Sequence, residues 1–199
     1  MSLSVPDSLL TLHTSRLLLR RLNLDDAPAI FSYAHDPEVT KFTGWETHRT
    51  VADSEFYIEQ IVLPNYANGK SIDWGIVLKE RQQLIGVCSL GNIHPLHQRA
   101  ELGYSLSRTH WGQGLATEAA QAVISFGFHV LFLNRIEGKC HHQHHASAKV
   151  LTKLGMEFEG ILRQYMFVTG NFWDVCSYAL LKPRYSSVPL IPADWLVNG

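Results

Sequence analysis

Two closely spaced glycines, Gly112 and Gly114, lie between a segment patterned like a strand and a segment patterned like a helix. Apolar residues alternate over residues 99–106, and small and apolar residues recur at helical spacing over residues 116–130. The first turn of a helix has backbone amides without intrahelical partners and the positive end of the helix dipole, and glycine has no Cβ to hold an anion away. The segment is therefore predicted to bind a phosphate or pyrophosphate group.

The segment does not match the two well-known phosphate-binding loops. No lysine followed by Ser or Thr comes after Gly114, as a nucleoside triphosphatase loop requires, and the three-glycine spacing of dinucleotide-binding folds is missing. A tight turn without a ligand is the other interpretation of such a glycine pair. The strand before the glycines and the helix after them favour an anion site of another family.

Residues 111–119, which read Trp-Gly-Gln-Gly-Leu-Ala-Thr-Glu-Ala, resemble the GCN5-related N-acetyltransferases (GNAT), whose signature is Gln or Arg, two residues, Gly, one residue, then Gly or Ala. Trp111 stands where that family usually has Gln or Arg, and this variant is similar to the ribosomal-protein N-acetyltransferase (RimJ/RimL-like) branch. The resemblance covers about residues 10–183, with segments similar to the branch's opening strand, fourth strand and a later helix at residues 14–17, 100–104 and 147–156.

The resemblance implies an α/β (α+β) fold. We expect a mixed, mostly antiparallel central sheet of about seven strands, splayed between the fourth and fifth strands and flanked by about four helices. Residue patterns also predict a helix cap at Asp25 or Asp26, a helix end at Pro64 and a hairpin turn at residues 169–171. The predicted elements are strands at residues 16–22, 71–78, 83–90, 99–106, 135–141, within 156–167 and at 172–181, and helices at residues 51–62, 116–130 and 146–154.

The chain of 199 residues has 46% apolar residues, a formal net charge of -1 and a pI near 6.8. This length suits one domain, residues 1–199, which we divide into a core at about 10–183 and a C-terminal extension at 184–199. The balanced charge argues against direct nucleic-acid binding. No signal-like or membrane-spanning segment is visible, so we expect a cytoplasmic protein without a membrane partner.

Cysteines and histidines give no consistent metal pattern. Cys88, Cys140 and Cys176 are widely spaced and each lies in a strand-like run, so we expect small buried thiols. Residues 141–145 hold four histidines, but no cysteine or carboxylate with zinc-ligand spacing surrounds them. We expect no required metal, and adventitious metal capture at this loop is the alternative.

Acetyl-CoA is the cofactor that the resemblance implies, with coenzyme A as product. The pantetheine arm would pair with the backbone of the fourth strand, and the pyrophosphate with amides of the glycine loop. His144 stands where the branch has an asparagine that contacts the coenzyme, and an imidazole still donates a hydrogen bond. The residues implied are Tyr104, Ser105 and Leu106 for the arm, Trp111, Gly112, Gln113, Gly114, Ala116 and Thr117 for the pyrophosphate loop, and His144 and Ser147 at the later helix.

Acetyl transfer to an amine needs a neutral nucleophile, a route for its proton and a donor to the departing thiolate. Glu101 matches a glutamate of the family's fourth strand and is the predicted base, with a solvated or ion-paired carboxylate as the alternative. Ser147 matches a serine of the branch and is the predicted acid, with a helix-capping serine as the alternative. Tyr104 and Tyr165 are further candidates for the proton donor.

In this family the region between the first two helices forms one wall of the acceptor site. Here that region holds Phe42 and Trp45, and Trp74 beside Asp73 is a further candidate; aromatic core residues are the alternative interpretation of each. The resemblance favours a ribosomal-protein N-terminus as acceptor, attacked directly in a ternary complex, with polyamines, aminoglycosides and amino acids as alternatives. A non-catalytic acyl-CoA-binding module is the competing class. The apolar C-terminal tail hints at a homodimer.

Overall fold

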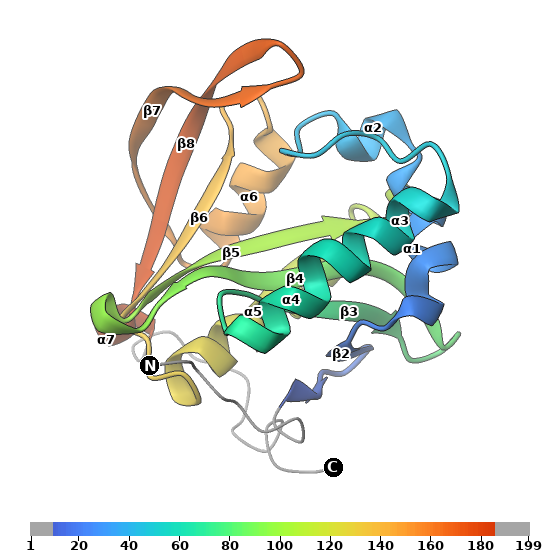
Figure 1. Cartoon of the computed structure of the whole chain (residues 1–199). Helices are drawn as coiled ribbons and strands as arrows, with labels where there is room; N and C mark the ends of the chain where they lie inside the picture. The colour runs from blue at the N-terminus through green and yellow to red at the C-terminus, as the bar shows by residue number, and fades with distance from the viewer. Residues whose placement is uncertain (1–9, 186–199) are drawn as a thin grey trace.

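The computed structural model describes residues 10–185, which form an eight-stranded sheet in the order β1-β2-β3-β4-β5-β6-β8-β7 (Figure 1). Neighbouring strands are antiparallel except β5 and β6, which are parallel. The expected mixed sheet is confirmed, and the short β1 adds an eighth strand. The strands are β1 Leu12–His13, β2 Leu17–Arg21, β3 Ile72–Leu78, β4 Gln83–His94, β5 Arg99–Leu106, β6 Arg135–His141, β7 Glu157–Val168 and β8 Asn171–Leu181.

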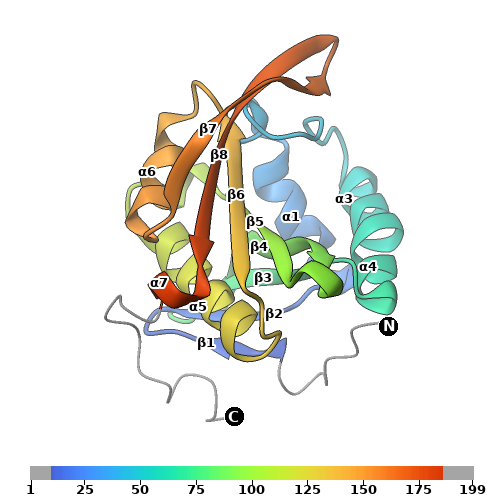
Figure 2. The same ribbon diagram turned by 90° about the vertical axis from the view of Figure 1, so that its left-hand side faces the viewer.

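Helices cover both faces of the sheet. In Figure 2, α5 and α6 lie on one side of the sheet, and α1, α3 and α4 lie on the other. We call these sides the α5 face and the α1 face. The helices are α1 Ala27–Ala34, α2 Pro37–Thr40, α3 Val51–Tyr57, α4 Leu63–Asn68, α5 Leu115–His129, α6 His145–Lys153 and α7 Lys182–Tyr185, with a π-helical turn at Ile58–Val62.

The helix that was predicted to stop at Pro64 continues to Asn68. The π-helical turn joins α3 directly to α4, and Pro64 lies in the first turn of α4. Proline has no N–H to donate, and it is tolerated where a helical segment begins or where the regular hydrogen-bond ladder is already interrupted. Gly69, with φ 67°, ends the helix instead.

Two predicted turns have different outcomes. Thr169 and Gly170, with φ of 46° and 82°, form the expected hairpin turn between β7 and β8. Asp26 is the N-cap residue of α1, with Pro28 in the first turn as predicted, but its side chain makes no capping hydrogen bond to that helix. The side chain of Asn23 caps the preceding short helical turn by accepting from the Asp25 N–H at 2.9 Å.

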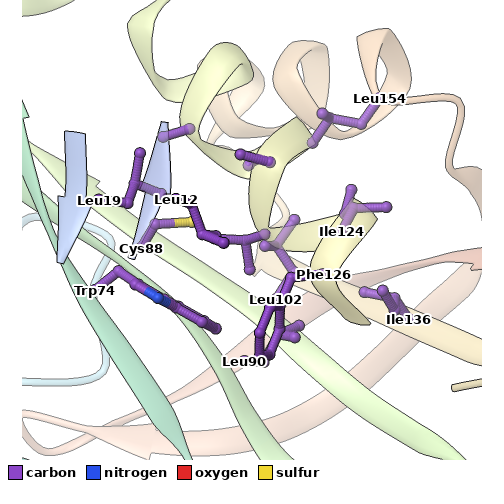
Figure 3. Close-up of a cluster of buried hydrophobic side chains, with 14 of the residues drawn as sticks. Leu12, Leu19, Trp74, Cys88, Leu90, Leu102, Ile124, Phe126, Ile136 and Leu154 are labelled. Carbon is purple, nitrogen blue, oxygen red and sulfur yellow. The ribbon is translucent and has the colours of Figure 1, made fainter. Parts of the chain in front are cut away.

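The main hydrophobic core lies between the sheet and α5. Trp74 is fully buried there, its indole N–H donates to the Leu10 carbonyl oxygen (2.8 Å), and its ring meets Phe126 edge-on at 5.2 Å (Figure 3). The prediction that Trp74 contacts the acceptor is therefore wrong. The aromatic residue at this strand position points into the α5 core, and its neighbour Asp73 points to the opposite face.

The sheet opens between β5 and β6. Their parallel pairing runs from Arg99↔Arg135 to Leu102↔Gly138, whereas β5 continues to Leu106 and β6 to His141. The last residues of β5 and β6 therefore do not pair with each other, which is the splay that the family resemblance implies. We call this gap in the pairing the opening.

Candidate active site

Gly112 and Gly114 form an accessible backbone loop in front of α5. Their φ angles are 74° and 77°, in the left-handed region, and Gly114 is the N-cap of α5. A Cβ on Gly112 would meet no atom within 4 Å, and a Cβ on Gly114 would meet one atom at 3.7 Å. The helix ladder starts with the Glu118 N–H donating to the Gly114 carbonyl oxygen (3.0 Å), so the amides of Ala116 and Thr117 have no acceptor within the helix. These features fit a bound pyrophosphate.

Two side chains fix the shape of this loop. The Trp111 indole N–H donates to the carbonyl oxygen of Leu106 at the end of β5 (2.7 Å), and the Gln113 side-chain amide donates to the carbonyl oxygen of Thr109 (3.1 Å). Trp111, which departs from the family signature, therefore attaches the loop to β5. The side chains of Trp111 and Gln113 serve the loop's geometry, which leaves main-chain amides to contact an anion.

A carboxylate that sequence reasoning missed ties the loop to the start of β2. Glu118 Oε1 accepts hydrogen bonds from the hydroxyls of Thr14 (2.5 Å) and Ser15 (3.0 Å). The Arg16 guanidinium is 2.6 Å from Glu118 Oε2 and also donates to the Gln113 carbonyl oxygen (3.0 Å). We call Thr14, Ser15, Arg16 and Glu118 the Glu118 clamp. Both of its segments belong to the family resemblance, but no spacing in the sequence indicates that they meet.

Main-chain groups of β5 border the opening. The Ser107 N–H donates to the Ile85 carbonyl oxygen in β4 (2.8 Å). Successive residues of a strand direct their main-chain groups to opposite edges, so Ser105 also faces β4, while Tyr104 and Leu106 face the opening. Tyr104 and Leu106 stay candidates for contacting a pantetheine arm, and the structure contradicts that role for Ser105.

A hydroxyl pair links β5 to α6 on the α5 face. The Tyr104 and Ser147 hydroxyl oxygens are 2.8 Å apart and hydrogen-bonded. Ser147 is buried, and burial raises the pKa of Tyr104, so the phenol is protonated at neutral pH. Ser147 lies inside the first turn of α6, and the N-cap residue His144 makes no side-chain capping bond, so the capping interpretation of Ser147 is wrong.

Glu101 lies on the α1 face of β5 and is ion-paired. Its Oε2 is 2.5 Å from Lys139 Nζ and accepts a hydrogen bond from the Asn92 side chain (3.3 Å). Lys139 is also 3.6 Å from Glu137 Oε2. Burial lowers the pKa of Lys139, but the hydrogen bond to Glu101 together with the negative charges of Glu101 and Glu137 outweighs it, so the pKa lies above its ordinary value. The ammonium thus stays charged beside Glu101, and Tyr165, 52% exposed, lies with its ring 5.6 Å from the same ammonium.

Phe42 joins the predicted acceptor wall to the predicted coenzyme site. Its ring stacks on His141 and His144 with centroid distances of 5.0 and 4.9 Å. Burial lowers the pKa of both imidazoles, so His144 is neutral at neutral pH and has one ring N–H to donate. His141, which the sequence presented only as part of a histidine run, also meets Trp173 edge-on at 4.7 Å.

The loop that carries Phe42 and Trp45 lies against the β7–β8 hairpin. A Cβ on Gly44 would be 2.8 Å from Met166 Cε in β7. Trp45 is 37% exposed, and its ring lies 5.4 Å from that of His48. Trp45 is therefore accessible, unlike Trp74.

Within residues 10–185, no group of three or more His, Cys, Asp or Glu side chains has the geometry to hold a metal ion. Cys88, Cys140 and Cys176 are free thiols, and burial raises the pKa of Cys140 to about 11. Over the same residues, no helix has both the length and the apolar character needed to cross a membrane.

A sheet that opens beside an anion-binding helix start defines an acyltransferase that uses coenzyme A. Residues 16–157 match the family described as Acetyltransferase (GNAT) domain. The chain belongs to this family and is an acetyl-CoA-dependent N-acetyltransferase.

Three comparisons illustrate the relationship. The chain is 39% identical over 176 residues to the uncharacterized N-acetyltransferase p20 of Bacillus licheniformis. The aligned region covers 88% of this chain and 98% of p20. It is 38% identical over 104 residues to the ribosomal-protein-serine acetyltransferase of Escherichia coli (strain K12), covering 52% of this chain and 58% of the relative. A further match is the solved structure of RimL, a ribosomal L7/L12 alpha-N-protein acetyltransferase in complex with coenzyme A. It matches with a TM-score of 0.77 and 21% identity over 86% of this chain and 97% of the RimL chain, and it shows the same fold.

Proposed function

We propose that the protein acetylates the α-amino group at the N-terminus of a protein, with a ribosomal protein as the leading acceptor, by direct attack in a ternary complex. One observation carries the chemistry: the Tyr104–Ser147 pair lies at the opening, and Glu101 lies on the opposite face of β5, one residue before the last β5 residue that pairs with β6. The ribosomal acceptor is supported by residues 111–119 and by the similarity to a ribosomal-protein-serine acetyltransferase. A small-molecule amine is the second candidate acceptor.

The chain's residues divide the reaction between the two faces of β5. Bound acetyl-CoA supplies the activated acetyl group. Glu101 takes up the proton of the acceptor ammonium, directly or through water, on the α1 face. The Tyr104–Ser147 pair donates a proton to the departing thiolate on the α5 face and regains one from the second proton that the nitrogen loses as the amide forms. The amides after Gly114 hold the pyrophosphate.

An acceptor screen tests this proposal. Acetyl-CoA is mixed with the protein and with N-terminal peptides, polyamines, aminoglycosides or amino acids, and products are detected by mass together with thiol release. We expect acetylation of peptides that begin with serine or alanine. Acetylation of small amines alone would favour the second candidate, and coenzyme binding without turnover across the panel would favour a non-catalytic module.

Replacing either member of the hydroxyl pair should slow the chemical step. We expect Ser147→Ala and Tyr104→Phe each to lower kcat about 100-fold, the lower range for loss of a general acid, with little change in the KM for acetyl-CoA. The double variant should be no slower than the slower single variant, because the two hydroxyls act as one unit. Tyr165→Phe is the control, and a larger loss in that variant would transfer the donor role to Tyr165.

Glu101→Gln should slow acetyl transfer. We expect kcat/KM to fall about 100-fold at neutral pH, because the proton of the attacking amine loses its acceptor. Glu137→Gln is the matched control, since Glu137 contacts the same Lys139 ammonium on the same face. An unchanged kcat/KM in Glu101→Gln would remove Glu101 from the mechanism and leave it an ion-paired strand residue.

The remaining parts of the proposal concern the whole protein. We propose a single domain over residues 1–199 that works in the cytoplasm, where acetyl-CoA and ribosomes occur together. The apolar residues of the C-terminal extension support a homodimer, which sedimentation of the full chain will test.

A further inference from the structure

Asp73 is a buried carboxyl group without a cationic side-chain partner among the described residues. It is 8% exposed, and its Oδ2 accepts one hydrogen bond, from the Ser71 hydroxyl at 3.0 Å. Among residues 10–185, no Lys, Arg or His side chain forms an ion pair with it. Burial raises its pKa to about 6, so the group is largely ionised at neutral pH. A buried, unpaired carboxylate is unfavourable unless something outside the chain compensates its charge.

The second oxygen of Asp73 reaches solvent. Oδ1 has no hydrogen-bond partner in the described part of the chain, and no side-chain nitrogen or oxygen there is both sealed from solvent and without a partner. The hydroxyl of Tyr57 in α3 likewise has no hydrogen-bond partner among the described residues and is not sealed from solvent. Its pKa is raised, first by burial and then by the charge of Asp73. Two polar atoms that interact electrostatically are therefore accessible from outside, although both residues are largely covered.

Aromatic side chains connect Asp73 with the predicted acceptor wall. The Tyr66 hydroxyl donates to the main-chain carbonyl oxygen of Asp73. The rings of Trp45 and His48 are 5.4 Å apart, and those of His48 and Tyr57 are 6.5 Å apart. The π-helical turn starts directly after Tyr57, and such turns are frequent at functional sites. A line of rings thus runs from exposed Trp45 to the surroundings of Asp73.

The sheet register relates Asp73 to the opening. Asp73 pairs with Ser89 in β4, and Ser89 pairs with Gly103 in β5. Gly103 follows Leu102, the last residue of β5 that pairs with β6. Two strand spacings, roughly 10 Å, therefore separate Asp73 from the edge of the opening. Ser89 and Gly103 carry a small side chain or none, so no large strand side chain stands between the two places on the α1 face.

We propose that Asp73, bordered by Tyr57 and Tyr66, binds a positively charged group of the acceptor that is distinct from the amine being acetylated. The acceptor would place its reacting amine at the opening and a second cation at Asp73, where a carboxylate and aromatic rings both favour positive charge. This inference rests on the proposed function, because it assigns a specificity residue to the same acceptor site. Asp73 would favour acceptors that carry a second positive charge, whether they are peptides or small amines.

Diamines and monoamines of equal length test the inference. The probes are α,ω-diaminoalkanes of increasing length and n-alkylamines with the same numbers of carbon atoms. For the wild-type protein we expect kcat/KM to be about tenfold higher for the best diamine than for its matched monoamine, the effect of one charge-assisted hydrogen bond. Asp73→Asn should abolish this preference by raising the KM for the diamine, with the KM for acetyl-CoA and kcat/KM for the monoamine unchanged.

Control variants and a binding measurement complete the design. Asp25→Asn, which neutralises an exposed aspartate, should keep the preference. Asp73→Asn should melt no lower than wild type at neutral pH, because a carboxyl whose folded pKa is raised destabilises the fold when ionised. Calorimetric titration of the coenzyme A complex with both probe types needs no turnover. Equal binding of diamine and monoamine, or an equal loss of both in Asp73→Asn, would overturn the inference; preferential diamine binding without any acetylation would overturn the proposed function alone.

Discussion

Gly114→Val will bind coenzyme A about 100-fold more weakly than the wild-type protein, as measured by calorimetric titration. Gly114 has φ 77° and precedes the first helical amides, so a β-branched side chain there is strained and occupies the path of the pyrophosphate. Loss of two amide–phosphate hydrogen bonds at about 1.5 kcal/mol each accounts for this factor. The left-handed conformation adds a stability cost of about 1–2 kcal/mol for a residue with a Cβ.

The hairpin supplies a matched control for this variant. Gly170 has φ 82°, and a Cβ there would meet no atom within 4 Å, but it lies in the turn between β7 and β8. Gly170→Val should therefore show a similar loss of stability with normal coenzyme A affinity. If both variants lose affinity equally, strain rather than the phosphate site explains the result; if neither does, the site lies elsewhere.

Glu118→Gln will weaken both the fold and the coenzyme site. The carboxylate accepts bonds from the Thr14 hydroxyl and the Arg16 guanidinium, and the latter also holds the Gln113 carbonyl group. Replacing the charge with an amide should lower the free energy of unfolding by about 2 kcal/mol. We expect the KM for acetyl-CoA to rise about tenfold with kcat nearly unchanged, because the loop shifts while the groups around β5 stay in place.

The pH dependence of this variant has a defined sign. Burial raises the pKa of Glu118, but the hydrogen bonds from Thr14, Arg16 and Ser15 outweigh it, so the folded pKa is lowered. The stabilisation is therefore present above the unfolded pKa, about 4.3, and is lost as the pH falls through the folded value. The difference in unfolding free energy between wild type and Glu118→Gln should shrink in acid. Glu159→Gln, which breaks a more exposed ion pair with Arg135, is the control and should leave the KM for acetyl-CoA unchanged.

Local patterns predicted the elements of the fold better than they predicted its sites. The alternation over residues 99–106 and the spacing over residues 116–130 locate β5 and α5, because one buried face requires that periodicity. Trp74 was misplaced because alternation does not say which of two covered faces a side chain meets. Whether the main-chain N–H and C=O groups of Ser105 face β4 or the opening depends on the register between β4 and β5. The sequence of one strand does not determine this register.

The other features of the site depend on contacts between residues far apart in the sequence. The Glu118 clamp joins residues about a hundred positions apart in the sequence, and the pairing of Tyr104 with Ser147 depends on how α6 packs beside β5. The unpaired state of Asp73 is a property of its surroundings. The residue type shows that such side chains are polar. Their burial and their contacts decide whether they stabilise the fold or contact a ligand.

Phe42 has a thermodynamic consequence for the order in which ligands bind. One ring stacks on His141 and His144, so a single side chain joins the proposed acceptor wall to the proposed coenzyme site. An acceptor that moves this ring changes the free energy of the coenzyme site. Reciprocity then requires bound coenzyme to change acceptor affinity by the same factor. We therefore expect the two substrates to be energetically linked before any bond between them forms.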